Sequence, residues 1–366
     1  MRKKLCYVIP AYDAESHTHF AYLADFVREL AKAFDVFLVI ERGDVLGDLL
    51  GCARVACAGR GGFTRFIRVK WYLFRAWMWG ARWFYVHYSF FSACVAACIT
   101  RCMGGKTFYW NCGEPWKYRR GLLREAFERF TYCIVHAVVT GTDGLAKRYA
   151  EEYSLPLNKV VVMPNWIRLG DQRLMTNDQR QKGKTELHVH KDQKIILFVH
   201  RLSRRKGAHY LPDIVEKLDD DHAVLLIAGD GPEAESLKGK VQNLHIQERV
   251  RFLGWVPQDT VMDLMRMADA FLMPSDEEGF PHVLLEAMAA GLPFVGTLVG
   301  GVAEMTPPEV RSYLVASGDV SGIAEQLREV LALGPREREA LATRFAEWVA
   351  RYDIARVAER FKEIIQ

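Results

Sequence analysis

Two glutamates stand on either side of a glycine turn in the segment SDEEGFPHVLLEAMAAGLPFVG, residues 275–296. Glu278 precedes the turn at Gly279, and Glu286 lies eight positions after Glu278, in the helix that the sequence predicts. Such a pair can accept hydrogen bonds from two sets of hydroxyl groups on one extended ligand. Glu278 alone could instead cap the helix, but Glu286 has apolar neighbours, and a buried carboxylate needs partners.

Backbone donors lie next to Glu278, at the predicted start of the same helix. Gly279 and Phe280 lead to Pro281, a residue type favoured in the first turn of a helix. Amide groups at a helix N-terminus can donate to an anion or to sugar hydroxyls. The turn is therefore expected to contribute to the same site as the two glutamates.

A second segment, FVHRLSRRKGAHYL at residues 198–211, brings cations to the end of a predicted strand. Arg201 and Lys206 bracket the turn before the next helix, whereas Arg204 and Arg205 are interpreted as part of a basic surface loop. Cations beside helix amides are typical of a diphosphate site, where they would stabilise a departing nucleotide.

Three further glycines occupy turns between a strand and a helix. Gly231 in AGDGPE is weak support by itself, because a structural turn is the default for such a segment. Gly300 and Gly301, followed by Glu304, form another loop whose backbone a ligand can approach closely. Several such loops at equivalent strand ends are difficult to attribute to chance, and they indicate one ligand site along a sheet edge.

Apolar strands alternate with helices throughout the chain, which predicts two doubly wound α/β domains. Ligands bind at the carboxyl ends of the strands in such sheets, so we expect two Rossmann-like domains that face each other across a cleft. The predicted strands of the first half are KLCYVIPAY, DVFLVIER, WFYVHY, TFYWNC, HAVVTGT and KVVVMPNW, and those of the second half are KIILFVHR, HAVLLIAGD, VRFLGWV, AFLMPS, PFVGTL and SYLVAS.

A polar, helix-poor stretch separates the two series of strands. At 366 residues the chain is long enough for two domains. We predict a first domain at residues 1–168, a linker at 169–194, a second domain at 195–345 and a C-terminal helix at 346–366. The last helix, expected from about Glu337 to Ile365, is long and charged, and it could cap its own domain or cross back to the first one.

The net charge of +4 is unevenly distributed. No Asp or Glu occurs in the 65 residues from Leu49 to Gly113, which carry nine Arg and Lys residues, and segment 60–88 mixes cations with aromatic residues. Such a helix suits an anionic bilayer surface, where rings lie at headgroup level. Nucleic-acid binding and a packed helix with extended cations are the alternatives. We favour the membrane, because a solvated helix does not require so long a stretch without an acid.

The eight cysteines lie in the first 133 residues and form no Cys-x-x-Cys pair. Cys94, Cys98 and Cys102 share a helix face but lack partners at ligand spacing, so buried reduced thiols are expected rather than a metal site. Residues 83–100 are uncharged but divide into a strand and a helix, which argues against a membrane span. With no signal peptide in the sequence, we expect a cytoplasmic protein on the inner face of the cytoplasmic membrane.

The motifs FVHRLSRRKG, AGDGPE, FLGWVP, EEGFPHVLLEAMAAGLP and GGVAE occur in an order that resembles family 4 retaining glycosyltransferases of the GT-B fold. The likeness is strong over residues 195–306 and weaker in the first half. It implies transfer of a sugar, with retention, from a UDP- or GDP-sugar to a glycan or lipid-linked acceptor. It also implies that no metal or other cofactor is needed and that the final helix returns to the first domain.

The resemblance further implies a role for each motif residue. The catalytic set is Glu278, Arg201 and Lys206, in which the two cations hold the diphosphate in place of a metal and Glu278 contacts the transferred sugar. Among the donor-binding residues, Glu286 would bind the ribose hydroxyls. The others lie in loops whose backbone would approach the donor closely: Gly231, Gly279, Phe280, Pro281, Gly300 and Gly301.

The sequence departs from the family pattern at three places. The first loop, usually rich in glycine, reads DAESHT, which leaves His19 as an acceptor-side candidate. A histidine that often follows the fourth or fifth strand is replaced around Asn111 and Cys112, the other two acceptor-side candidates. His200 stands where glycine is usual before Arg201, and we expect it to narrow the approach of the phosphates.

Two other functions are compatible with the same motifs. An epimerase or hydrolase of the GT-B fold would act on the nucleotide sugar itself, without an acceptor. A non-catalytic glycan-binding scaffold would be expected to have lost residues such as Arg201, Lys206 or Glu286, and all three are present. Glycosyl transfer is therefore the leading hypothesis, with no nucleic acid among the expected partners.

Overall fold

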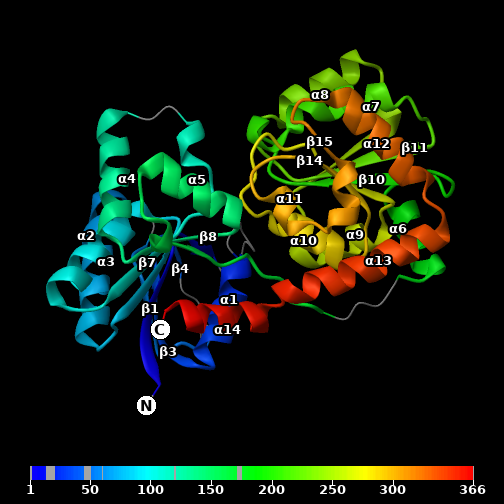
Figure 1. The fold of residues 1–366 in the computed structure, drawn as a ribbon. Coiled ribbons are helices and arrows are strands. Elements are labelled where there is room, and N and C mark those ends of the chain that lie inside the picture. The colour runs from blue at the N-terminus through cyan, green and yellow to red at the C-terminus, as the bar shows by residue number, and fades with distance from the viewer. Residues whose placement is uncertain are drawn as a thin grey trace. The chain divides into compact units, whose positions relative to one another are not determined.

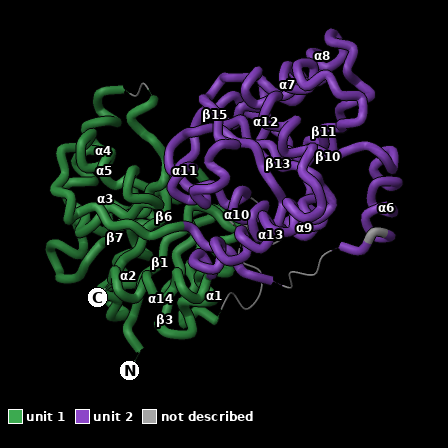
Figure 2. Tube along the Cα trace, turned by 45° about the vertical axis from the view of Figure 1, so that its right-hand side comes forward, with its two compact units in different colours: residues 1–164, 354–366 green, residues 165–353 purple. Residues whose placement is uncertain are grey.

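The computed structural model forms two compact units, Met1–Pro164 with Ile354–Gln366, and Asn165–Asp353 (Figure 2). Each unit is a parallel sheet with helices on both faces (Figure 1), which confirms the prediction of two Rossmann-like α/β domains. The structure describes residues 2–13, 21–44, 51–59, 61–118, 121–170 and 175–365.

The sheet of the first unit has seven parallel strands in the order β5-β3-β1-β6-β7-β8-β9. Counted in chain order within the sheet, this is 3-2-1-4-5-6-7, so the order reverses between β1 and β6. The strands are β1 Lys3–Ile9, β3 Phe34–Ile40, β5 Arg54–Cys57, β6 Trp83–His87, β7 Lys106–Trp110, β8 Ala137–Thr140 and β9 Val160–Val162, and a separate parallel pair is formed by β2 Tyr12–Asp13 and β4 Gly43–Asp44.

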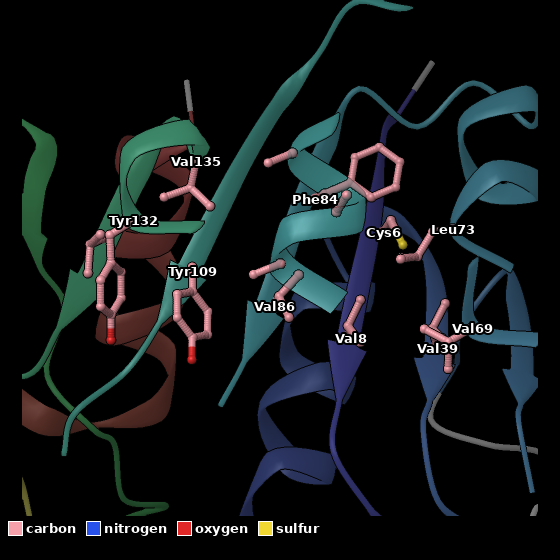
Figure 3. Packing of buried hydrophobic residues seen from close by; sticks show 14 of the residues in the cluster. Cys6, Val8, Val39, Val69, Leu73, Phe84, Val86, Tyr109, Tyr132 and Val135 are labelled. Atoms are coloured by element: carbon pink, nitrogen blue, oxygen red, sulfur yellow. The ribbon is translucent and has the colours of Figure 1, made fainter. Parts of the chain in front are cut away.

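Side-chain alternation in β1 places Cys6 and Val8 on one face of this sheet and Tyr7 on the other. The Cys6 face packs against α2, α3, α4 and α5, as Figure 3 shows for part of the buried cluster. On the opposite face, Phe361 of α14 contacts Tyr7 and Phe26, with ring centroids 6.3 and 5.8 Å apart. The helices are α1 Ala21–Ala31, α2 Gly62–Met78, α3 Phe90–Met103, α4 Leu122–Ile134, α5 Asp143–Tyr153 and α14 Ile354–Ile364.

The sheet of the second unit has six parallel strands in the order β12-β11-β10-β13-β14-β15. In chain order this is 3-2-1-4-5-6, the order of the Rossmann fold, which reverses between β10 and β13. The strands are β10 Lys194–Val199, β11 Ala223–Ala228, β12 Val250–Gly254, β13 Ala270–Met273, β14 Phe294–Thr297 and β15 Leu314–Val315.

Helices cover both faces of the second sheet as well. α7, α8 and α12 pack on the face that carries Ile196 and Phe198, and Phe345 of α13 stacks on Phe294 at 5.7 Å. The helices are α6 Asn177–Glu186, α7 Leu211–Leu218, α8 Ala234–Asn243, α9 Gln258–Met267, α10 His282–Ala289, α11 Val302–Met305, α12 Val320–Ala332 and α13 Pro335–Val349. Short 3-10 helices are η1 Pro115–Lys117, η2 Leu157–Lys159, η3 Arg204–Lys206, η4 Ala208–Tyr210, η5 Gln247–Arg249, η6 Pro308–Tyr313 and η7 Ala350–Tyr352.

The boundaries between the units differ in detail from those expected. The second unit begins at Asn165 rather than after a linker, and the stretch 169–194 contains α6, which begins with a capping box at Thr176 and Gln179. The long helix expected at the C-terminus is interrupted at η7, where Asp353 takes an extended conformation and pairs with Ile167. Only α14 then belongs to the first unit.

Every strand predicted from the sequence is present, while β2, β4 and β5 were not predicted. Residues 83–100 form β6 and most of α3, the division that the sequence favoured. Within the described parts of the chain, no helix combines the length and apolar character needed to cross a membrane.

Candidate functional site

The cations and the first glutamate of the predicted site lie on loops after two neighbouring strands of the second unit. Arg201 and Lys206 follow β10, and Glu278 follows β13. These strands are adjacent where the strand order of the sheet reverses. Ligands of open α/β sheets bind at such a switch point, outside the carboxyl ends of the strands. Topology therefore brings together residues 72 positions apart in the sequence.

Glu278 is the centre of this cluster, and its side chain is only 4% exposed. Its Oε1 accepts a hydrogen bond from Lys206 Nζ at 2.7 Å and from Ser275 Oγ at 2.9 Å. His200 Nε2 lies 3.3 Å from the same oxygen. The hypothesis that Glu278 caps α10 is wrong, because the carboxylate faces these three groups and the N-cap of the helix is Pro281.

Opposing effects act on the charge of Glu278. Burial alone would raise the pKa of its carboxyl group, but the Lys206 ammonium and the hydrogen bond from His200 hold that pKa well below its usual range. Glu278 is consequently a carboxylate at neutral pH. The site thus contains a buried, charged acceptor next to a buried cation.

Close backbone packing fixes the two loops to each other. Gly207 has φ 68°, and a Cβ at this position would lie 1.8 Å from the Pro274 carbonyl oxygen. The Asp276 amide donates to the Arg205 carbonyl at 3.0 Å. Any residue larger than glycine at position 207 would therefore separate the Lys206 loop from the Glu278 loop.

Arg201 differs from Lys206 in its surroundings. Its side chain is exposed and forms no ion pair within the described residues, whereas Lys206 is buried against Glu278. Arg204 and Arg205 are exposed, as expected for a basic surface loop, and Arg205 Nη1 lies 3.9 Å from Glu277 Oε1. One cation is thus held in place and another is available at the surface.

The turn between Glu278 and α10 is held by a side chain from the start of the unit. Asn165 Nδ2 donates to the Phe280 carbonyl at 2.7 Å, and the Phe280 ring packs edge-on against Tyr352 at 5.3 Å. Pro281 is the N-cap residue, so α10 begins one residue later than the sequence suggested. These contacts determine where the Gly279 backbone lies.

Glu286 lies on α10 with its own partner. Gln258 Nε2 of α9 donates to Glu286 Oε1 at 2.6 Å. The side chain is half-buried, and burial of the carboxyl group raises its pKa to about 7 despite the hydrogen bond from Gln258, which lowers it. No hydrogen bond or ion pair joins Glu286 to Glu278, Arg201 or Lys206 in the described part of the chain.

The predicted glycines lie on loops at the same edge of the second sheet. The Gly301 amide donates to the Gly279 carbonyl at 3.2 Å, so the loop after β14 packs against the loop after β13. Gly300 precedes it and is exposed. A Cβ on Gly231 would lie 2.3 Å from the Leu202 carbonyl oxygen, so this glycine packs the loop after β11 against the loop after β10.

Two of the three acceptor-side candidates, Asn111 and Cys112, lie in the loop after β7. His19 lies outside the described residues. Asn111 follows β7 and is held inside the first unit, since its Nδ2 donates to Tyr132 Oη at 3.0 Å and its Oδ1 accepts from the Gly113 amide at 3.1 Å. Cys112 is buried beside it. The amide of Asn111 therefore positions a loop.

Sequence reasoning missed Ser275 and Gln258, each of which donates to one of the two glutamates. Ser275 had a local signal, because it follows β13 and lies three residues before Glu278. Gln258 had none, since it lies 28 positions from Glu286. Across the described residues there is no group of three or more His, Cys, Asp or Glu side chains arranged to hold a metal ion.

The second unit contains the segment that matches a known family model. Residues 179–348 match the family model described as "Glycosyl transferases group 1". Over 58% of this chain and 54% of the relative, the chain is 32% identical to N-acetyl-alpha-D-glucosaminyl L-malate synthase of Bacillus anthracis. Over 50% of this chain and 40% of the relative, it is 30% identical to the phosphatidylinositol N-acetylglucosaminyltransferase GPI3 subunit of Saccharomyces cerevisiae. The chain spans about half the length of these curated relatives.

A solved structure extends the likeness over the whole chain. Anabaena HepE in complex with UDP and glucose superposes with a TM-score of 0.80, covers 99% of both chains and is 16% identical. At this identity the similarity shows the fold alone. It extends over both units of the chain.

Proposed function

We propose that this chain, in which residues 179–348 match the glycosyl transferases group 1 family model, transfers a hexose from a nucleoside diphosphate sugar, UDP- or GDP-linked, to a glycan or lipid-linked acceptor. The observation that carries the proposal is the buried pair of Lys206 and Glu278 at the switch point of the second sheet. Both curated relatives carry N-acetylglucosaminyl chemistry in their names, and HepE holds UDP and glucose. These similarities support a sugar nucleotide as the donor.

The proposed roles follow from charge and exposure. Arg201, with its exposed guanidinium, and Lys206 would stabilise the diphosphate as the bond to the sugar breaks and negative charge develops on the leaving group. Glu278 would accept a hydrogen bond from a hydroxyl of the transferred sugar, and Glu286 from the ribose. We propose that these two cations serve in place of a metal, that no cofactor is required, and that the anomeric configuration is retained.

The first unit supports the membrane part of the proposal. Val69, Leu73 and Ala76 of α2 pack into the core, whereas Phe63 is 79% and Trp71 is 52% exposed on the same helix. The interpretation that all aromatic residues of segment 60–88 are core residues therefore does not hold for these two. Exposed cations on α2 accompany them, at Arg68, Lys70 and Arg75.

A second helix adds to this surface. Leu122 and Leu123, at the start of α4, are 86% and 90% exposed, the highest values for large apolar side chains in the described chain. α3 connects the two helices, since Phe91 contacts Phe66 of α2 at 4.9 Å and Phe90 contacts Phe127 of α4 at 5.5 Å. We call the exposed residues Phe63, Phe66, Ile67, Trp71, Leu122 and Leu123 the apolar rim.

The apolar rim has the composition expected at a bilayer interface. Arg124 lies over the Phe90 ring at 5.7 Å and Lys70 over the Phe91 ring at 5.7 Å, so cations accompany the apolar groups. Leucine and aromatic side chains enter the headgroup region while cations meet anionic lipid. We propose that this surface holds the enzyme at the inner face of the cytoplasmic membrane, where a lipid-linked acceptor would be found.

The proposed donor can be tested directly. A thermal-shift panel of UDP-, GDP- and ADP-sugars is expected to show a raised Tm with one base, because a ligand that binds only the native state stabilises it. Absence of a shift with every sugar nucleotide would contradict the proposal. A positive nucleotide then serves in a transfer assay with lipid-linked and soluble glycan acceptors; release of free sugar alone would indicate a hydrolase.

Glu278→Ala tests the site. Transfer is expected to fall by about 100-fold or more, because a preorganised polar contact to the reacting sugar is lost. Glu277→Ala is the matched control, since this adjacent carboxylate is also buried but lies next to the exposed Arg205 rather than next to Lys206. Circular dichroism of both variants checks the fold. Equal turnover by Glu278→Ala and the control would remove Glu278 from the site.

A further inference from the structure

The donors around Glu278 are distributed unequally between its two carboxylate oxygens. Oε1 takes the hydrogen bonds from Lys206 and Ser275, and it is the oxygen that faces His200 Nε2. Oε2 accepts no hydrogen bond from a described residue. A carboxylate has room for about four hydrogen bonds, so Oε2 retains its full capacity to accept from a ligand.

The His200 ring is fixed in one orientation. Its Nδ1 accepts a hydrogen bond from the Arg201 amide at 2.9 Å. Because a neutral imidazole has one donor and one acceptor nitrogen, Nε2 then carries the proton and donates toward Glu278. The ring therefore turns toward the carboxylate.

The backbone that carries this ring is fixed as well. The His200 amide donates to the Ala228 carbonyl at 3.2 Å, and a Cβ on Gly229 would lie 1.9 Å from the His200 carbonyl oxygen. The side chain is 15% exposed. The backbone of His200 is thus held in place at the end of β10, from where its ring reaches Glu278.

We propose that His200 is a positioning residue for the transferred sugar. Together with Lys206 and Ser275 it holds Oε1, so that Oε2 is the oxygen offered to a sugar hydroxyl. This role is distinct from the expected narrowing of the phosphate approach by His200. The inference rests on the proposed function, since it assigns Oε2 to the sugar part of the donor and leaves the nucleoside diphosphate to other residues.

The experiment compares His200→Ala with His200→Gln. Glutamine offers an amide donor at a similar reach to Nε2, so it is expected to restore what alanine removes. The probes are UDP-glucose and UDP-N-acetylglucosamine against UDP, and GDP-mannose against GDP. His222→Ala is the control of the same residue type, because His222 is exposed and lies just before β11, at the opposite end of the strand from the loops of the site.

His200→Ala is expected to weaken binding of the nucleotide sugar by about 10-fold, the value of one hydrogen bond to a charged group. Binding of the nucleoside diphosphate alone is expected to change less than about 3-fold. His200→Gln is expected to recover most of the loss, and kcat is expected to follow the same order. His222→Ala is expected to match the unchanged protein in every measurement.

Two results would overturn the inference. An equal loss for the nucleotide sugar and for the diphosphate would make His200 part of the phosphate approach instead. Unchanged binding of both ligands in His200→Ala would give His200 no role in sugar positioning, while transfer itself would stand. The proposed function fails separately, if the unchanged protein binds none of the probes. If His200→Ala does not fold, as judged by thermal melting, His200→Gln decides, by its affinity for the nucleotide sugar relative to the nucleoside diphosphate. A relative affinity near that of the unchanged protein supports a donor at this position. A 10-fold loss contradicts it.

Discussion

In the second unit the loops after β10 and β13 bury a lysine and a glutamate against each other, whereas in the first unit α2 and α4 expose leucine, phenylalanine and tryptophan beside arginine and lysine. Both units have parallel sheets whose strand order reverses near the middle. The shared topology therefore does not determine which chemistry each unit carries. Buried, paired charges suit a small polar ligand that hydrogen-bonds to them, and exposed apolar groups with cations suit an extended surface.

The largest expected effect comes from breaking the buried pair in the second unit. Lys206→Ala leaves the Glu278 carboxylate buried with only neutral donors, and it should lower the free energy of unfolding by about 3 kcal/mol. Urea denaturation followed by circular dichroism measures the change.

The first unit provides the matched control for Lys206→Ala. Lys70→Ala removes an exposed lysine from α2 and should change the free energy of unfolding by less than about 0.5 kcal/mol. A loss as large as that in Lys206→Ala would mean that cations on the two units are not held differently.

The second prediction sharpens the role of the apolar rim. Leu122→Asp with Leu123→Asp should lower binding to vesicles containing anionic phospholipid by about 10-fold or more, because two exposed leucines no longer enter the interface and two acids are added. Sedimentation with vesicles at low salt measures binding. Transfer to a soluble acceptor should stay unchanged in the same variant.

Leu157→Asp is the matched control for the apolar rim. Leu157 also belongs to the first unit and is 58% exposed, but it lies in η2, outside the apolar rim. The substitution should leave vesicle binding within about 2-fold. Equal losses in both variants would show that general charge, and not this surface, governs adsorption, and no binding by the unchanged protein would defeat the membrane proposal.

The smallest expected effect concerns Glu286. Its pKa is raised to about 7 from 4.5, so the folded protein binds more protons than the unfolded chain between these values, and stability falls as pH rises through that window. Glu286→Gln removes the titration. Relative to the unchanged protein, the free energy of unfolding of this variant should be higher by about 1 kcal/mol at pH 8 and equal at pH 4. The figure is smaller than the full pKa shift implies because the carboxyl group is partly exposed to solvent. Denaturant titrations at the two pH values check this, and a constant difference would argue against the raised pKa.

Local patterns in the sequence determined much of this protein. Alternating apolar strands and helices specify two parallel α/β units, because burial on both faces of a sheet requires apolar runs such as KIILFV in β10. Glycine and charge at the strand ends identified Glu278, Lys206 and Glu286 as candidates. The sequence determined the final helix and the boundary near residue 164 less well. The helix is interrupted at η7, next to the point where Asp353 pairs with Ile167, far away in the sequence.

Tertiary structure decided the partners of each candidate. Lys206 meets Glu278 only because β10 and β13 are neighbours. Gln258 meets Glu286 across two helices, and His200 Nε2 faces the Glu278 carboxylate. Leu122 joins the surface of α2 through α3. Such contacts depend on strand order and helix packing over long sequence separations, which local residue preferences do not encode.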